Sequence, residues 1–166
     1  SSSTSDADLF LVLHVYDPQG HEIVFSGAQH PRTPVSQGWL RASHRALDRE
    51  KSTDYRPYHL HTRKEPLVRG QVYALDVEIW PTSIVVPRGY RIGLSVRGTD
   101  YDYGETAQAA ANLAVHTTSK QKKRGPGAFM HDDPRDRPAE IYGGSVSIHT
   151  GGACESYVLL PVIPAP

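Results

Sequence analysis

Residues 9–20 read LFLVLHVYDPQG, and this stretch decides the class of fold. Its first eight residues, Leu9 to Tyr16, are β-branched, aliphatic or aromatic with one histidine, a composition typical of a buried strand. Asp17 to Gly20 supplies Asp, Pro and Gly, the residues that favour a turn. We therefore predict a strand and a turn, with 22–26 returning as the antiparallel partner.

Short segments of the same kind recur along the chain. The clearest is 71–79 (QVYALDVEI), where apolar and polar side chains alternate as in a half-buried strand closed by Trp80-Pro81. Residues 39–47 fit either a strand or a short helix, because their periodicity does not separate the two. Further predicted strands are 83–86, 90–96, 145–149 and 157–162, the last two forming a closing pair around Gly151-Gly152.

Short strands separated by Gly and Pro, with almost no amphipathic helix, favour an antiparallel β-sandwich or jelly roll over a βαβ fold. The exception is 99–144, a long and partly helical insertion. Within it, 105–116 (ETAQAAANLAVH) has alanine-rich helix propensity and 120–127 (KQKKRGPG) is basic and turn-rich. Connections of this length tend to be functional or mobile, so a surface insertion and a docking loop both stay open.

Composition limits the classes of function. The chain has 166 residues, with 18 Lys+Arg balancing 18 Asp+Glu, so it lacks the basic field of a typical nucleic-acid binder. A single cysteine, Cys154, excludes an internal disulfide framework and says little about the compartment. No apolar run is long enough to cross a bilayer, and the start has neither Met nor a signal-peptide pattern. We expect a soluble piece of a longer protein, with the cytoplasm slightly favoured.

One histidine pattern suggests a metal. His59, His61 and Glu65 follow the spacing HxHxxxE, and alternation along a strand would place both imidazoles on one face, as in half of a cupin motif. Thr53 stands where that motif has glycine, and Ile92 stands where it would supply another histidine. Flanking prolines at 57 and 66 fit an irregular loop equally well. We predict no metal and keep a cupin-like metal-dependent enzyme as the alternative.

Nucleophilic and acidic patterns give no catalytic residue. GxSxG is absent, and Ser145 in Gly143-Gly144-Ser145 continues into a predicted strand. Cys154 with His149 is better read as an ordinary thiol. Paired aspartates occur at 6 and 8, at 100 and 102, and at 132 and 133, without a calcium-loop spacing. We interpret His131 to Pro138 (HDDPRDRP) as a rigid loop with internal ion pairs, with an interdomain contact as the alternative.

Three separated blocks, 38–45 (GWLRASHR), 78–83 (EIWPTS) and 160–164 (LPVIP), occur in the order of one known family. They resemble the C-terminal, non-catalytic domain of the CocE/NonD serine hydrolases. That group includes cocaine esterase, Xaa-Pro dipeptidyl-peptidase and glutaryl-7-ACA (cephalosporin) acylase-like enzymes. The resemblance covers nearly the whole chain.

The resemblance implies a jelly roll of galactose-binding-like topology, packed against an α/β-hydrolase domain that carries the Ser, Asp and His of the triad. It transfers no catalytic residue and no cofactor to this chain. The expectation is a single domain, 1–166, that lacks its first strands and the preceding α/β-hydrolase domain. A sandwich without those strands exposes unpaired edges, so we expect the rest of the protein or a homo-oligomer to cover them.

The function that the resemblance implies is an accessory domain of a serine hydrolase of acyl esters, amides or Xaa-Pro dipeptides. This domain would stabilise the catalytic domain of the same polypeptide and border its substrate pocket; no nucleic acid or membrane partner is expected. Another alternative is a carbohydrate-binding module using Trp39 and tyrosines, with Trp80 interpreted as core. The residues predicted to border the pocket are Tyr101, Tyr103, Phe129, Met130, His131, Asp132, Asp133 and Arg135.

Overall fold

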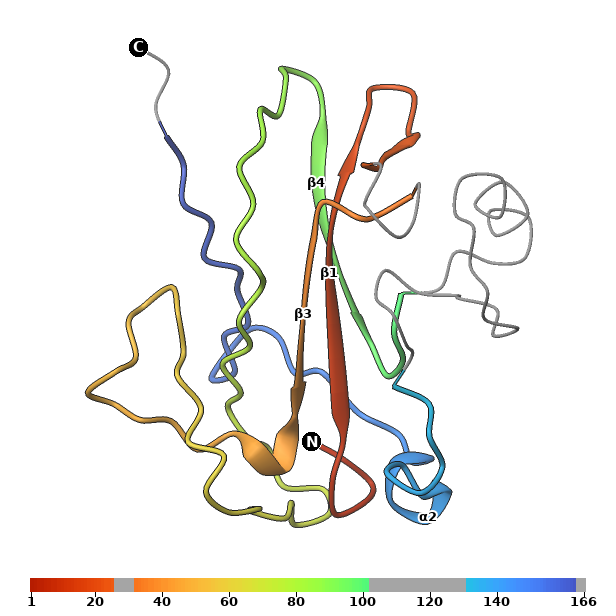
Figure 1. Ribbon diagram of the computed structural model, residues 1–166, viewed down its shortest axis with the longest axis vertical. Helices are drawn as coiled ribbons and strands as arrows, with labels where there is room; N and C mark the ends of the chain where they lie inside the picture. Colours follow the sequence, from red (N-terminus) through yellow and green to blue (C-terminus); the bar gives the residue numbers. More distant parts are fainter. Residues whose placement is uncertain (26–31, 102–130, 164–166) are drawn as a thin grey trace, which may run out of the picture. The chain divides into compact units, whose positions relative to one another are not determined.

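The computed structural model describes residues 1–25, 32–101 and 131–163, and its regular elements are mostly antiparallel strands (Figure 1). This confirms the all-β class; the jelly-roll arrangement stays a prediction. Helix in the described residues is confined to two single turns. The elements are β1 (Asp8–Tyr16), β2 (Glu22–Ile23), β3 (Ser36–Arg41), η1 (Ala42–His44), β4 (Arg91–Arg97) and α2 (Ala139–Tyr142).

Strand β1 organises the sheet, because β2, β3 and β4 all pair with it. Its partner β4 runs antiparallel in a register that joins Leu13 to Leu94 and Val15 to Ile92. Strand β2 pairs with the end of β1 and joins Val15 to Ile23, which confirms the predicted antiparallel return, although the strand ends at Ile23 and is shorter than the predicted 22–26. The turn between β1 and β2 closes at Gly20, whose φ of 89° is a conformation that glycine adopts without strain.

The two faces of β1 differ in chemistry because successive side chains point to opposite sides of a strand. Leu9, Leu11, Leu13 and Val15 share one apolar face, on which a core cluster forms. That cluster contains Leu13, Val15 and Val35, packed against Ile23, Ile79, Ile84, Val86 and Tyr90. The opposite face carries Phe10, Val12, His14 and Tyr16. It is the only β1 face with polar and ring-bearing side chains, and it positions the candidate site.

The chain divides into two compact units. One contains 8–39 and 79–137, and therefore β1, β2, β4 and most of β3. The other contains 1–7, 40–78 and 138–166, and backbone hydrogen bonds join its separate segments. Ser3 N donates to Ser145 O at 2.9 Å, and Leu67 N donates to Ser5 O at 2.7 Å.

Several strand predictions were wrong. No strand forms at 71–79 or 83–86, although burial does alternate over 72–77, and none forms at 145–149 or 157–162. Alternating polarity records which side of an extended chain faces apolar surroundings, but a strand also needs a neighbour that accepts its hydrogen bonds. Around Gly151-Gly152 only the bridge Gly151↔Cys154 forms, whereas Val146 bridges Ser2.

The remaining elements confirm other expectations. Strand β4 covers nearly all of the predicted strand 90–96, and Tyr90 N donates to Pro87 O in the predicted turn at 3.1 Å. Residues 39–47 contain both structures that their pattern allowed, since β3 ends at Arg41 and the 3₁₀ turn η1 follows directly. The helix predicted at 105–116 lies outside the described residues.

Candidate functional site

Two tryptophans meet at the surface of the unit that contains β1. Trp39 lies on β3, and Trp80 is held beside this strand because its N–H donates to Gln37 O at 2.9 Å and its carbonyl accepts from Ser36 Oγ. The two indole centroids are 4.9 Å apart with a tilt of 56°. Trp39 is 40% exposed and Trp80 52%, so the prediction that Trp80 is core was wrong. Pro81 ends the pattern at Trp80 but does not decide which side its ring faces.

A histidine–carboxylate pair adjoins these rings. Asp100 accepts two hydrogen bonds from His131, one from its backbone N–H at 2.7 Å and one from Nδ1 at 2.8 Å. A carboxylate only accepts, so the Nδ1 of His131 carries the proton. The imidazole centroid lies 5.3 Å from Trp39 and 5.6 Å from Phe10. We call Phe10, Trp39, Trp80, Asp100 and His131 the tryptophan–histidine cluster.

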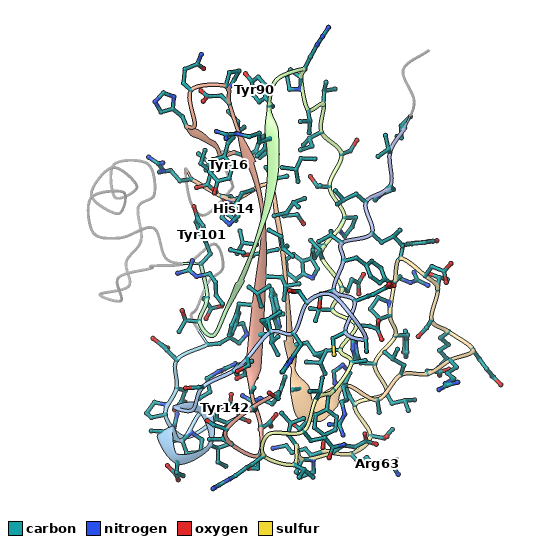
Figure 2. All side chains as sticks on the ribbon, turned by 180° about the vertical axis from the view of Figure 1, so that it is seen from behind. His14, Tyr16, Arg63, Tyr90, Tyr101 and Tyr142 are labelled. Carbon is teal, nitrogen blue, oxygen red and sulfur yellow. The ribbon has the colours of Figure 1, made fainter. Side chains whose placement is uncertain are left out.

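A second polar group, the His14 network, follows on the same face of β1. His14 donates from Nδ1 to Glu22 Oε1 at 2.5 Å, and its Nε2 lies 2.9 Å from Ser95 Oγ on β4. The other oxygen of Glu22 accepts from the Tyr101 hydroxyl at 3.1 Å. Figure 2 shows His14, Tyr16 and Tyr101 close together beside β1 and β4, in agreement with centroid distances of 5.8 and 6.1 Å from His14.

The hydroxyl of Tyr101 stays protonated to high pH. Burial raises the pKa of Tyr101 to about 12, and the negative charge and hydrogen bond of Glu22 act in the same direction. Because only the neutral phenol can donate to Glu22, this contact persists throughout the physiological range. Tyr101 is thereby fixed in the His14 network, one residue after Asp100 of the tryptophan–histidine cluster.

Ser95, His14 and Glu22 are hydrogen-bonded to one another in the order of a catalytic triad, but their surroundings differ from those of a triad. Ser95 is the fifth of the seven residues of β4, which pairs regularly with β1 along its length. A nucleophilic serine of the α/β-hydrolase type stands on a sharp turn beside oxyanion-hole N–H groups. In the described residues the line is therefore a structural hydrogen-bond network that holds β2, β1 and β4 together.

An ion pair closes the other end of this face. Arg137 Nε lies 2.7 Å from Asp8 Oδ2, and both side chains are largely buried. The same guanidinium lies over the Phe10 ring at 5.8 Å. A buried ion pair is costly to break, since removing one partner leaves an uncompensated charge. Arg137 thus ties the end of the HDDPRDRP loop to the start of β1.

The residues predicted to border the pocket lie in different parts of the structure. Tyr101 joins the His14 network and His131 joins the tryptophan–histidine cluster. Asp133 and Arg135 form an exposed ion pair of 2.7 Å, and hydrogen bonds from Arg135 lower the pKa of Asp133; this confirms internal pairing in the loop. Asp132 is exposed. Tyr103, Phe129 and Met130 lie outside the described residues.

The metal alternative finds no ligand set in the part of the chain that is described. His59 and His61 have ring centroids 5.9 Å apart, but the carboxylate of Glu65 pairs with Arg63 at 2.9 Å and with Arg45 at 3.6 Å. His61 has φ of 51°, which breaks the strand alternation that the pattern assumed. Burial lowers the pKa of His59, and the charge of His61 adds to this. Described residues contain no group of three or more His, Cys, Asp or Glu able to hold a metal.

The sequence interpretation missed His14, Glu22 and Ser95. Ser95 gives no signal, because serine is common in strands. His14 did carry one: it is the only polar side chain in the apolar run 9–16, and a histidine in a buried strand needs hydrogen-bond partners. A neighbouring carboxylate could have been sought on the predicted return strand, where Glu22 occurs.

Comparison with known proteins matches the chain to a non-catalytic domain family and to parts of longer proteins. A family model described as the X-Pro dipeptidyl-peptidase C-terminal non-catalytic domain matches residues 1–159. Two crystal structures of a CocE/NonD family hydrolase from Staphylococcus aureus are similar. One has a TM-score of 0.63 at 25% identity and covers 78% of this chain and 22% of that one. The other has a TM-score of 0.62 at 26% identity, covering 75% and 20%.

Curated relatives agree with this placement. Proteins named "Putative serine esterase" from Mycobacterium bovis and Mycobacterium tuberculosis are each 30% identical over 105 residues, which is 60% of this chain. The chain spans only 15% of their length. Among the described residues, no helix has the length and apolar character required to cross a bilayer.

Proposed function

Because the chain belongs to the X-Pro dipeptidyl-peptidase C-terminal non-catalytic domain family, we propose that it supports the catalytic domain of a longer serine hydrolase and borders its substrate pocket. The relatives named as serine esterases are several times longer than this chain. Reaction chemistry on acyl esters, amides or Xaa-Pro dipeptides would belong to the catalytic domain. This chain would supply contact area and shape at the pocket mouth.

The observation that carries this proposal is the half-exposed tryptophan pair. Tryptophan is the residue type most enriched at the energetic centres of protein interfaces, because it buries a large area at low cost in conformational entropy. Trp39 and Trp80 contact each other, and Asp100 fixes His131 beside them. A rigid aromatic surface with a polar margin suits a permanent contact between domains better than a mobile loop does.

The test uses the complete hydrolase. Trp39→Ala and Trp80→Ala should each lower its thermal unfolding midpoint, because truncating a central interface tryptophan typically costs at least about 2 kcal/mol of contact energy. His131→Ala should alter KM more than kcat if its side chain borders the pocket. Tyr55→Ala is the matched control, since Tyr55 is 71% exposed on a turn remote in sequence from the cluster. Unchanged stability and kinetics in all three cluster variants would argue against the docking role.

The exposed tryptophan pair also favours one second candidate, a carbohydrate-binding module. Sugars stack on exposed aromatic rings, and a histidine–aspartate pair beside such rings offers hydrogen bonds to hydroxyl groups. Glycan-array binding that is lost in Trp80→Ala, together with unchanged hydrolase kinetics, would select this candidate. The docking proposal expects no glycan binding. Homo-oligomerisation stays a prediction, which sedimentation of the complete protein would decide.

A further inference from the structure

Two histidines outside the candidate site lie with their rings next to each other. The Nδ1 atoms of His44 and His61 are 3.4 Å apart, and the ring centroids are 5.3 Å apart with a tilt of 39°. His44 ends the 3₁₀ turn η1, and His61 lies 17 residues later in an exposed segment of the same compact unit. Neither residue takes part in the tryptophan–histidine cluster or in the His14 network.

The backbone holds this histidine pair in place. Leu60 N donates to Ala46 O at 2.9 Å, so the residues that follow His44 are paired with those that precede His61. His61 itself has φ of 51°, a left-handed conformation that residues other than glycine adopt at a cost in energy. The ring of His59 packs against the ring of His61 with centroids 5.9 Å apart and limits its rotation. The two Nδ1 atoms therefore face each other from a fixed backbone.

The separation of the two nitrogens matches that of two ligands on one tetrahedral zinc ion. Zn–N bonds of about 2.0–2.1 Å at the tetrahedral angle place two ligand nitrogens about 3.3–3.4 Å apart. The ring positions agree independently. Nitrogens that converge on such an ion put their ring centroids about 5.2–5.3 Å apart, whereas nitrogens that point straight at each other across 3.4 Å put them about 5.7 Å apart. The observed 5.3 Å fits the converging arrangement.

We propose that His44 and His61 bind a divalent transition-metal ion, Zn²⁺ by preference, through their two Nδ1 atoms. Imidazole nitrogen is a ligand for Zn²⁺, Cu²⁺ and Ni²⁺, whereas Mg²⁺ and Ca²⁺ prefer oxygen. The contact between the rings is exposed, so water completes the coordination of the ion. In the hydrogen-bonded pair one Nδ1 carries a proton; on binding, this ring holds its proton on Nε2, and both Nδ1 lone pairs reach the ion.

This pair differs from the HxHxxxE set that the spacing suggested. The carboxylate of Glu65 is engaged by two arginines, and the Nε2 of His59 is buried with no hydrogen-bond partner in the described ranges. The proposed site has two protein ligands, and so it is smaller than the groups of three or more that the described residues lack. A bound ion would join the turn η1 to the segment 58–61, which goes beyond the proposed docking function.

Titration of the complete hydrolase with Zn²⁺ alone, followed by calorimetry, tests the proposal. The unmodified protein should bind one zinc ion per chain that His44→Gln and His61→Asn each bind at least about 10-fold more weakly. Asparagine suits position 61, because it tolerates a positive φ. An excess of Mg²⁺ should not displace the zinc. If the unmodified protein bound no zinc, or if both variants bound it equally well, the proposal would be overturned.

His59→Phe is the matched control, because it keeps a ring against His61 and removes the imidazole nitrogens. Its zinc affinity should equal that of the unmodified protein; a loss would assign the ion to the HxH spacing and overturn the proposed pair. Zinc should also raise the unfolding midpoint of the unmodified protein and of His59→Phe, but not that of His44→Gln. Because the docking role is judged from Trp39 and Trp80, either proposal can fail without the other.

Discussion

Replacing Asp6 by Ala should cost more stability than any exposed substitution, because its carboxylate joins three segments of one unit. Oδ1 accepts from Ser43 N and Ala7 N, each at 2.9 Å, and Oδ2 accepts from the Tyr142 hydroxyl at 2.9 Å. Asp6 is 7% exposed and Ser43 is 1% exposed. Asp6→Ala leaves two buried amides without this acceptor, at about 1–3 kcal/mol each, so we expect a loss of about 2–6 kcal/mol.

Urea denaturation, followed by tryptophan fluorescence, measures this change as a shift of the midpoint at constant slope. Asp6→Asn is the matched control: it keeps one carbonyl acceptor, so its loss should be clearly smaller. A double-mutant cycle with Tyr142→Phe isolates the hydroxyl contact, which should couple to Asp6 by about 1 kcal/mol. If Asp6→Ala stayed within about 0.5 kcal/mol of the unmodified protein, the carboxylate would not be joining these segments.

Two further substitutions have equally definite outcomes. The raised pKa of Tyr101 means that its contact contributes stability below the ordinary tyrosine pKa of 10.0, and this contribution is lost as pH rises toward about 12. Glu22→Gln should therefore lower the pKa of Tyr101. The pKa is measured from the tyrosinate absorbance as pH rises, and the signal of Tyr101 is identified as the one that Tyr101→Phe removes. An unchanged titration would contradict the role of Glu22. Gly144→Ala should destabilise the protein by about 1–3 kcal/mol, because a Cβ there would lie 2.5 Å from Thr4 Cγ2. A neutral effect in urea denaturation would show that Thr4 moves aside freely.

The sequence predicted the sheet best where one segment contains its own partner. Residues 9–23 form a strand, a turn and a return strand, and all three were readable because the turn residues fix which segments meet. Strand β4 was equally readable, since Pro87 to Gly89 precede it. The pairing of β4 with β1, more than seventy residues earlier in the chain, could not be predicted, because polarity patterns carry no information about distant partners.

The candidate site was predicted only in fragments for the same reason. His131 was chosen from a polar loop, but its partner Asp100 lies 31 residues earlier and its ring contact Trp39 lies on another strand. Trp80 was assigned to the core because it ends an alternating segment, and yet half of its surface is exposed. A tryptophan in an apolar pattern marks a contact surface, and the pattern does not say whether the contacting partner belongs to the same fold.

The difference between the two faces of β1 explains why contact chemistry concentrates on one of them. Its Leu and Val face packs in the core cluster around Leu13 and Val15, and this face carries no polar side chain that could contact a partner. On the opposite face, His14 is buried at 8% exposure and is therefore satisfied internally by Glu22 and Ser95. Because His14 is already hydrogen-bonded within the fold, the side chains on this face that expose a large area to a partner are Trp39 and Trp80, at its other end. A partner that docks on this unit should consequently lose contact energy on truncation of Trp39 or Trp80 and not of His14, whose removal should act through stability of the sheet.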